Sequence, residues 1–296
     1  MGSSNSVNIT INLYRTNPFF YAGESVTGTV SVNIKEGHIT VDELFIVLKD
    51  ETGYTTTHTI HESNGSTRTE THYHHTIVFF SEKNIFERPG SGKKKESVYL
   101  SGQYLWRFDI QLPPQLPSTT NESHNLGTNE TLYLTVFPRV NLLNNPQCLI
   151  SSVFGNHNRK DVTLKGNIYK LGYVPGEMIT GILEIENPRK ILLKQVYLSL
   201  IQHYRIECNT GKETIIQTIL PTIVNTKQEH ITEKFSIAIP LTYLAPSYEF
   251  HGGFQHMANV HVNYILEFDV KAEGMFTNFD VNIPITLATE SDTNLN

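Results

Sequence analysis

Tyr-Ala-Gly-Glu-Ser-Val-Thr-Gly-Thr-Val-Ser-Val is the sequence of residues 21–32, and residues 173–185 read Tyr-Val-Pro-Gly-Glu-Met-Ile-Thr-Gly-Ile-Leu-Glu-Ile. Aligned on Gly23 and Gly176, both stretches fit Gly-Glu-x-(Val/Ile)-Thr-Gly-x-(Val/Leu)-x-(Val/Ile). In each copy the first glycine suits a turn position with positive φ, and the glutamate begins a strand. The second glycine lies inside that strand, which indicates a bulge or a close backbone approach.

A second motif is also repeated, further along each half of the chain. Residues 108–113 read Phe-Asp-Ile-Gln-Leu-Pro and residues 235–240 read Phe-Ser-Ile-Ala-Ile-Pro, and Pro-Ser follows at 117–118 and at 246–247. The proline ends a strand in both copies, because it has no N–H for the next ladder bond. Motifs repeated in the same order indicate a duplication, and copies of about 140 residues are typical of two like domains.

Alternation of apolar and polar residues is the main periodic signal between these motifs. It is clearest in residues 9–13, 26–34 and 260–271, which are rich in Val, Ile, Thr, Tyr and Phe. A period of two with these residue types predicts half-buried β-strands. Residues 191–201 are the one stretch that could pass as a helix, but apolar side chains alternate there too, so we predict a strand. The fold class expected is all-β, with two tandem antiparallel β-sandwiches.

The boundary between the two sandwiches is marked by composition. Asn, Pro and Gly gather between about residues 144 and 160, and strand-like periodicity resumes after them. We therefore expect an N-terminal sandwich at residues 7–146, a linker at 147–160 and a C-terminal sandwich at 161–288.

Composition and charge exclude several classes of protein. The formal net charge of −6 gives no basic surface for nucleic acid. No apolar run approaches the roughly 20 residues that span a bilayer, and the N-terminus has no secretory-signal pattern. Cys148 and Cys208 do not supply one disulfide per domain, so free thiols in a reducing compartment are favoured. These features predict a cytoplasmic protein.

The chain does not read as an enzyme, and no cofactor is implied. Gly-Ser-Gly-Lys at residues 90–93 suggests a phosphate loop, but Glu87 breaks the required spacing and Lys94 replaces the Ser or Thr that would bind Mg²⁺. The sequence holds neither the Gly-x-Ser-x-Gly of hydrolases nor the His-Glu-x-x-His of zincins.

Histidines crowd the arms of a hairpin whose turn is marked by Asn64-Gly65. If those are the two turn residues, His72 lies opposite Thr57 and His58 lies opposite Thr71. His58 and His72 then face opposite sides of the ribbon, which is poor geometry for a shared zinc ion, so we expect no metal. The crowded set is His58, His61, His72, His74 and His75.

The second-domain motifs resemble those of a known family. Tyr-Val-Pro-Gly-Glu at residues 173–177, followed by Ile-Glu-Asn at 185–187, resembles the opening of an arrestin C-terminal domain. Residues 260–266, Val-His-Val-Asn-Tyr-Ile-Leu, followed by Ile-Pro-Ile at 283–285, resemble the end of that domain.

The first-domain motifs point to the same family. Residues 21–28 resemble the N-terminal counterpart of that opening. Residues 101–113, Ser-Gly-Gln-Tyr-Leu-Trp-Arg-Phe-Asp-Ile-Gln-Leu-Pro, with Pro-Ser at 117–118, are similar to the Gly-x-x-x-(aromatic)-x-Phe-x-Phe-x-Leu-Pro run of α-arrestins. The resemblance extends from about Ile9 to Leu287 and is closest to the arrestin-domain-containing branch.

This resemblance implies a non-enzymatic adaptor that binds cytoplasmic segments of membrane proteins in trafficking, endocytosis or signalling. The sequence has no Pro-Pro-x-Tyr motif of the kind that recruits ubiquitin ligases through WW domains, so any ligase would be reached through another adaptor. Phosphate-sensing arrestins carry two basic residues on the first strand, and this chain has only Arg15 there.

Two alternatives remain open at this point. One is a coat-type trafficking subunit similar to the arrestin-fold component of retromer, whose first domain opens with a similar Tyr-x-Gly-Glu-Ser-Val. The other is a metal-dependent or secreted β-sandwich binding protein.

Two segments are candidates for peripheral membrane contact, at the plasma membrane or endosomes. Gly2 begins a Gly-x-x-x-Ser sequence that fits N-myristoylation. Lys93, Lys94 and Lys95 lie in a Gly/Ser-flanked loop and could contact anionic lipid head groups or a phosphorylated cargo tail. A single acyl chain binds membrane only marginally, so stable attachment needs a second contact.

Overall fold

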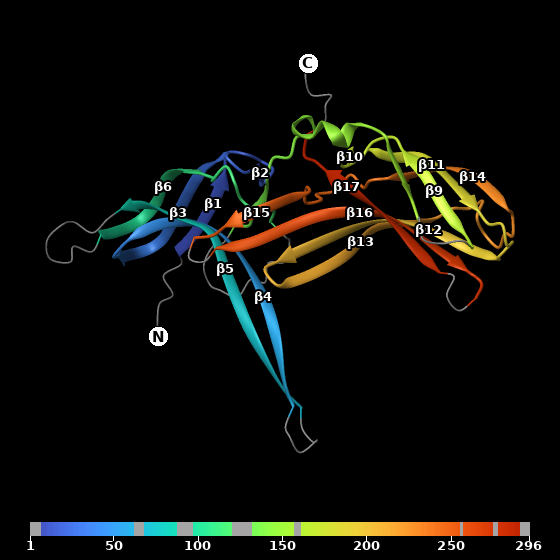
Figure 1. Cartoon of the computed structure of the whole chain (residues 1–296). Helices are drawn as coiled ribbons and strands as arrows, with labels where there is room; N and C mark the ends of the chain where they lie inside the picture. The colour runs from blue at the N-terminus through green and yellow to red at the C-terminus, as the bar shows by residue number, and fades with distance from the viewer. Residues whose placement is uncertain are drawn as a thin grey trace. The chain divides into compact units, whose positions relative to one another are not determined.

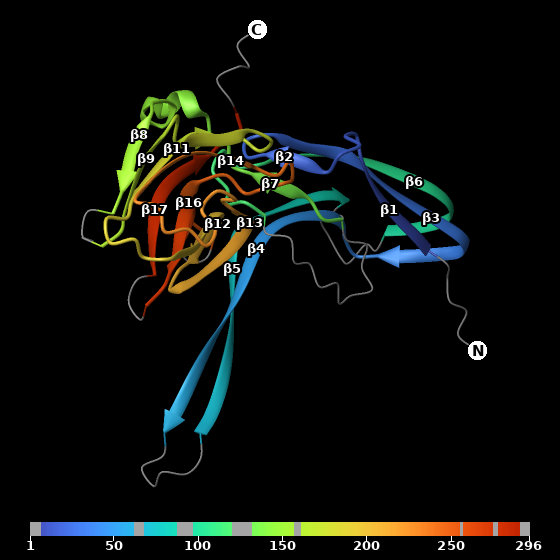
Figure 2. The ribbon, with the colours of Figure 1, turned by 90° about the vertical axis from the view of Figure 1, so that its right-hand side faces the viewer.

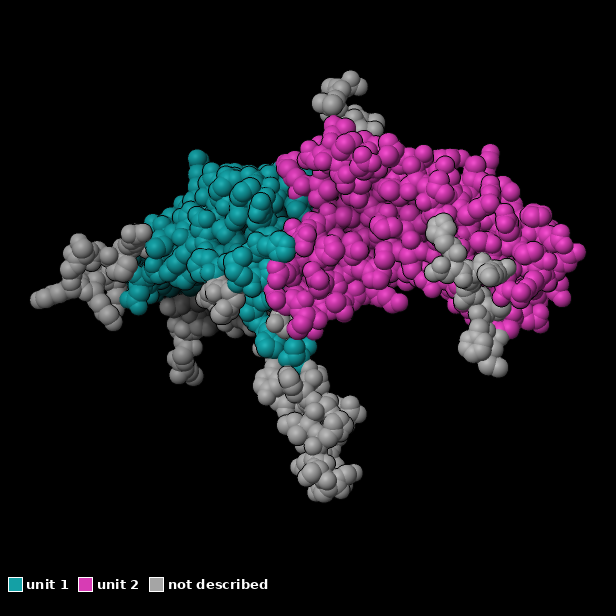
Figure 3. Space-filling model, viewed as in Figure 1, with its two compact units in different colours: residues 1–138, 250–258 teal, residues 139–249, 259–296 magenta. Residues whose placement is uncertain are grey.

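The computed structural model describes residues 7–61, 68–87, 97–119, 132–156, 161–254, 257–274 and 278–290. The side chains of residue 54, residues 57–61, 68–74 and residue 87 lie outside this description. The candidate residues Gly2, Lys93, Lys94 and Lys95 also fall outside the described residues. The chain forms two compact units, residues 1–138 with 250–258, and residues 139–249 with 259–296 (Figure 3).

Strands dominate both units, as the alternation predicts (Figure 1). The first half of the chain contains β1 (Val7–Leu13), β2 (Phe19–Tyr21), β3 (Ser25–Val41), β4 (Leu44–His61), β5 (Arg68–Glu87), β6 (Ser97–Gln111) and β7 (Thr135–Phe137). The second half contains β8 (Ser152–Gly155), β9 (Thr163–Ile168), β10 (Gly172–Tyr173), β11 (Met178–Glu186), β12 (Leu193–Ile206), β13 (Asn209–Ile219), β14 (His230–Ala238), β15 (Tyr248–Gly252), β16 (Ala258–Ala272) and β17 (Phe279–Leu287). Two short 3₁₀ turns, η1 (Leu142–Asn144) and η2 (Pro146–Leu149), precede β8. The stretch 191–201 forms most of β12, so the prediction of a strand there is confirmed.

The second unit is a two-layer sandwich. One layer is a four-stranded sheet in the order β14-β11-β9-β8, and the other has the order β10-β17-β16-β12-β13, with β15 also pairing β16. The alternation is clearest in β16, where every second residue is buried from Ala258 to Ala272. Leu183 from one layer and Phe268 from the other belong to the same buried core, and neither is exposed to solvent.

The first unit has the same all-β character. Its sheets have the orders β1-β3-β6, β2-β7 and β4-β5. Val26, Val30, Val32 and Ile34 of β3 are buried together with Ile110 of β6. The alternation in residues 26–34 therefore sets the core-facing side of the central strand, and the all-β tandem architecture expected from the sequence is confirmed.

The two repeated motifs lie opposite each other in both units. Gly28 of β3 pairs with Phe108 of β6, and Gly181 of β11 pairs with Phe235 of β14. A Cβ added at Gly28 would lie 2.7 Å from the Phe108 ring, and one at Gly181 would lie 2.5 Å from the Phe235 ring. The glycine leaves room for the ring from the neighbouring strand. The added Cβ would also lie 2.3 Å from a backbone carbonyl oxygen, that of Asn12 at Gly28 and that of Asn167 at Gly181, which is the close backbone approach predicted for the second glycine.

The long hairpin β4–β5 continues past the other strands of the first unit as a two-stranded ribbon (Figures 1 and 2). Its register places Thr57 opposite His72 and His58 opposite Thr71, as the Asn64-Gly65 turn predicts. The register shifts between Asp50 and Glu51, closer to the body of the unit. The outer part of the ribbon is thus regular.

Residues 139–149 pack within the second unit. Leu142, Cys148 and Ala288 form a small buried cluster, with Val140 and Leu149 against it. Cys148 is buried and Cys208 is exposed, and both are free thiols. The limits of the linker, residues 147–160, remain a prediction. Residues 139–149 belong to the second compact unit.

Candidate binding site at the glycine–glutamate turns

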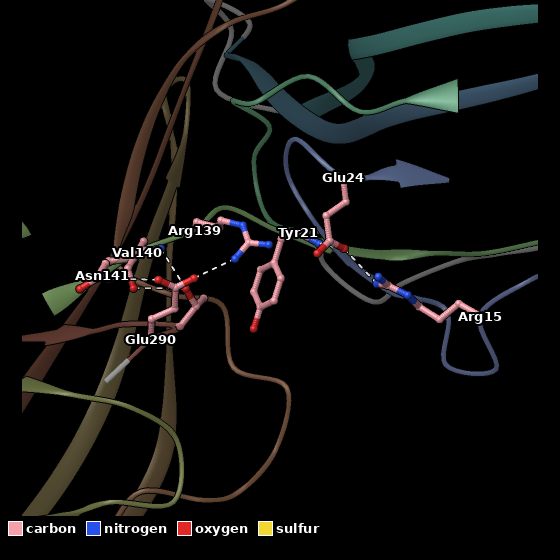
Figure 4. Close-up of polar contacts among 8 residues, drawn as sticks. Arg15, Tyr21, Glu24, Arg139, Val140, Asn141 and Glu290 are labelled. Atoms are coloured by element: carbon pink, nitrogen blue, oxygen red, sulfur yellow. Dashed lines mark hydrogen bonds and ion pairs between the residues drawn. The ribbon is translucent and has the colours of Figure 1, made fainter. Parts of the chain in front are cut away.

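The first glycine–glutamate turn is fixed by its glutamate. Gly23 has φ of 86°, which confirms the predicted turn position. The carboxylate of Glu24 accepts a hydrogen bond from the backbone N–H of Tyr21 at 3.2 Å and from Arg15 Nη1 at 2.9 Å (Figure 4). The Arg15 guanidinium also lies 4.5 Å from the centre of the Phe20 ring. The glutamate therefore closes the turn and holds a cation against an aromatic ring.

The second turn repeats this arrangement. Gly176 has φ of 89°, and Glu177 accepts a hydrogen bond from the Val174 N–H at 3.0 Å. Lys170 Nζ donates to both carboxylate oxygens of Glu177 at 3.0 Å and lies 4.9 Å from the centre of the Tyr173 ring. Burial raises the pKa of Tyr173 to about 12, and its hydroxyl donates to the Lys170 carbonyl at 2.7 Å.

An exposed tyrosine precedes the cation in each unit, and the sequence reasoning missed this third repeat. Tyr14 precedes Arg15 and is 62% exposed, and Tyr169 precedes Lys170 and is 50% exposed. The backbone N–H of Tyr14 donates to the carbonyl of Thr27. The backbone N–H of Tyr169 donates to the carbonyl of Thr180, which is the matching threonine of the second motif. The sequence pattern that could have revealed this repeat is Tyr-(Arg/Lys) a few residues before each glycine–glutamate turn.

Two chain segments meet at the second turn, where the Gly176 N–H donates to the Ile239 carbonyl, and each carries exposed side chains. We call these side chains, Tyr169, Met178, Leu241 and Tyr243, the turn cluster. Leu241 is 85% exposed, and its Cδ1 lies 3.1 Å from the position that a Cβ on Gly176 would take. Met178 starts β11 opposite Ala238 and is 49% exposed, and Tyr243 is 61% exposed. Tyrosine and methionine are enriched at protein interfaces, so this surface has the composition of a binding site.

The segment after β17 is tied to the start of the connecting segment. The Glu290 carboxylate accepts hydrogen bonds from Arg139 Nη1 at 2.8 Å and from Asn141 Nδ2 at 3.1 Å (Figure 4). The backbone of Val140 donates to Thr289 Oγ1 at 2.9 Å, and the Thr289 N–H donates back to the Val140 carbonyl at 2.9 Å. These contacts hold residues 139–141 within the second unit and were not signalled by any sequence pattern.

Two findings on the described residues concern metal binding and membrane crossing. These residues hold no group of three or more His, Cys, Asp and Glu side chains that could bind a metal ion. In the hairpin the described imidazole is that of His75, whose Nε2 lies 2.9 Å from Thr56 Oγ1. Within the described part of the chain, no helix has the length and apolar character needed to cross a membrane.

One titratable group in the first unit is strongly perturbed. Burial raises the pKa of Asp50 to about 7, and the neighbouring charge of Glu51 adds to the shift. Its Oδ2 is buried and has no hydrogen-bond partner among the described residues. The carboxyl is therefore most compatible with the fold when it is protonated.

Replacement of Asp50 by asparagine should increase stability to an extent that depends on pH. The unfolded carboxyl releases its proton near pH 4, whereas the folded one keeps it until about pH 7, so wild-type stability falls between these values. Asp50→Asn should raise the free energy of unfolding by about 1–3 kcal/mol at pH 8 and change it little at pH 4. Urea unfolding at both pH values, followed by the fluorescence of Trp106 in the same unit, measures this. Asp109→Asn, the same change at an exposed carboxyl of β6 in the same unit, is the control, and an equal Asp50→Asn effect at both pH values would contradict the assignment.

Family models match both units. The model described as Arrestin (or S-antigen), N-terminal domain matches residues 7–129, and the model described as Arrestin (or S-antigen), C-terminal domain matches residues 158–291. Comparison with individual curated proteins gave no match. The two domain matches occur in the order of the two sandwiches and account for most of the chain. On this evidence the chain belongs to the arrestin family.

Proposed function

We propose that this protein is a non-enzymatic adaptor that binds cytoplasmic segments of membrane proteins in trafficking, endocytosis or signalling. Arrestin-family proteins are generally adaptors of this kind, and both arrestin domains are present. The α-arrestin branch is the part of the family that its motifs resemble most. Recruitment of a ubiquitin ligase, where it occurs, would use a second adaptor.

The observation that carries the proposal is the turn cluster of the second unit. Its four apolar side chains are between 49% and 85% exposed, although nearly all apolar positions of the adjoining strands are buried. The cluster borders a turn in which the Glu177 carboxylate pairs with Lys170 and accepts a hydrogen bond from the Val174 N–H. An apolar surface beside a charged rim fits a short apolar segment flanked by polar residues.

Membrane contact would be a secondary source of affinity. We propose that acylated Gly2 and the cations of Lys93, Lys94 and Lys95 add weak contacts at the plasma membrane or endosomes, while cargo supplies the specificity. Salt screens the attraction between a lysine and an anionic head group beyond about 10 Å at 0.1 M, so this contribution to binding should weaken as salt increases.

A peptide array tests the proposal directly. The intact protein is applied to synthetic segments from the cytoplasmic and the extracellular faces of membrane proteins of the same cells. Cytoplasmic segments should bind selectively, and Met178→Ser with Leu241→Ser should weaken their binding about tenfold, because two apolar contacts are lost. Equal binding of both sets of segments would overturn the adaptor assignment.

The matched control changes exposed residues that belong to the other unit and not to the turn cluster. Val98→Ser with Leu100→Ser removes two side chains of similar size that are 58% and 64% exposed on β6 of the first unit. This variant should bind the array as the wild type does. If it weakens binding as much as the Met178 and Leu241 changes do, the turn cluster is not the cargo site.

A further inference from the structure

Strand β1 is an edge strand of the first unit. It pairs with β3 over all seven of its residues, from Val7 opposite Ile34 to Leu13 opposite Gly28, without a register shift. No other described strand pairs with it. Among the described residues its second edge has no pairing strand, so the backbone N–H and C=O groups along it can extend a sheet.

This edge lacks the protection that other edges of the protein have. Edge strands are usually blunted by charge, proline, a bulge or shortness. The edge strand β14 contains Glu233 and Lys234, the edge strand β13 contains Lys212 and Glu213, and β8 has only four residues. β1 reads Val-Asn-Ile-Thr-Ile-Asn-Leu, with no charge, no proline and no glycine.

The sequence of β1 is also symmetric about its centre. Reading outward from Thr10, the residues on the two sides are Ile9 and Ile11, then Asn8 and Asn12, then Val7 and Leu13. An antiparallel pair with a twofold axis through Thr10 would therefore place isoleucine opposite isoleucine and asparagine opposite asparagine. Such self-complementarity is the requirement of an isologous interface.

We propose that β1 pairs with β1 of a second copy of this chain, antiparallel and centred on Thr10. The pairing would join two β1-β3-β6 sheets into one continuous sheet. Its apolar face would gain the cross-strand pair of Ile9 and the partner's Ile11, where Ile9 is now 38% exposed. A segment of seven residues buries a small area, so the dissociation constant should be on the order of 1–100 µM.

Charge substitution at the axis tests the pairing. Thr10 is exposed on the polar face of β1, so Thr10→Lys should leave the fold intact while placing two lysines directly opposite each other across the axis. Sedimentation of the wild type at 100 µM should show dimers, and Thr10→Lys and Thr10→Glu should each be monomeric. An equimolar mixture of the two variants should form dimers again, because opposite charges then meet.

The controls separate this pairing from other outcomes. Thr40→Lys, an exposed position on β3 away from β1, should remain dimeric, and the Trp106 emission of every variant should match the wild type. The register is tested in a Cys208→Ser background with a short thiol cross-linker. Asn8→Cys mixed with Asn12→Cys should cross-link efficiently, and Asn8→Cys alone should not. A monomeric wild type at 100 µM, or a mixture of charged variants that stays monomeric, would overturn the proposal.

Discussion

Asn187→Ala is expected to lower the free energy of unfolding of the second unit by about 3–5 kcal/mol, because it leaves several buried backbone groups without partners. The Asn187 side chain has no exposed surface. Its Nδ2 donates to the carbonyls of Ile191 at 2.8 Å and of Gln228 at 3.3 Å, and its Oδ1 accepts from the Ile191 N–H at 2.9 Å. One side chain thus joins the loop after β11 to the loop before β14.

Urea unfolding followed by far-ultraviolet circular dichroism measures this loss. Trp106 is the only tryptophan of the chain and lies in the first unit, so its fluorescence reports whether that unit is unaffected. Asn282→Ala is the matched control, because Asn282 is exposed and its amide donates to the exposed Asp280 carboxylate at 2.6 Å. The control should change stability by no more than about 0.5 kcal/mol. A similarly small loss for Asn187→Ala would show that the loops do not depend on this side chain.

Gly28→Ala is expected to destabilise the first unit by about 3 kcal/mol through overpacking. A Cβ at this position would lie 2.3 Å from the carbonyl oxygen of Asn12 and 2.7 Å from the Phe108 ring. The ring could rotate away, but the carbonyl belongs to β1, which pairs with β3 along its whole length. Relief therefore requires separation of two paired strands.

Urea unfolding monitored by Trp106 fluorescence gives the size of this effect. Gly53→Ala is the control in the same unit, because its nearest non-neighbour atom, the carbonyl oxygen of His75, would lie 3.4 Å from the new Cβ. That contact is an ordinary one, and the control should be close to neutral. If both substitutions cost the same, the close approach at Gly28 is not what requires glycine there.

The sequence predicted the elements that depend on neighbouring residues in the chain. Alternation gave the strands, the Gly-Glu motifs gave turns with positive φ at Gly23 and Gly176, and Asn64-Gly65 gave the register of the β4–β5 ribbon. These predictions succeeded because strand periodicity and turn chemistry are local properties.

Features that depend on cross-strand neighbours could not be predicted. Alternation defines which face a residue occupies but leaves the register between distant strands open. For that reason the contact between Gly28 and Phe108 was not foreseen, although both belonged to motifs that the sequence repeats. The buried Oδ2 of the partly buried Asp50 and the Arg139–Glu290 ion pair were missed for the same reason, because each depends on residues distant in the sequence.

The adaptor function is tested most directly by the location of a bound membrane protein in cells. The membrane protein whose cytoplasmic segment binds most tightly to the array is followed by surface labelling, with and without this arrestin-family protein. We expect its removal to change the ratio of surface to internal cargo at least twofold. The wild type should restore that ratio, and the Met178→Ser, Leu241→Ser variant should not. An unchanged cargo distribution on removal, or full restoration by the variant, would contradict the account.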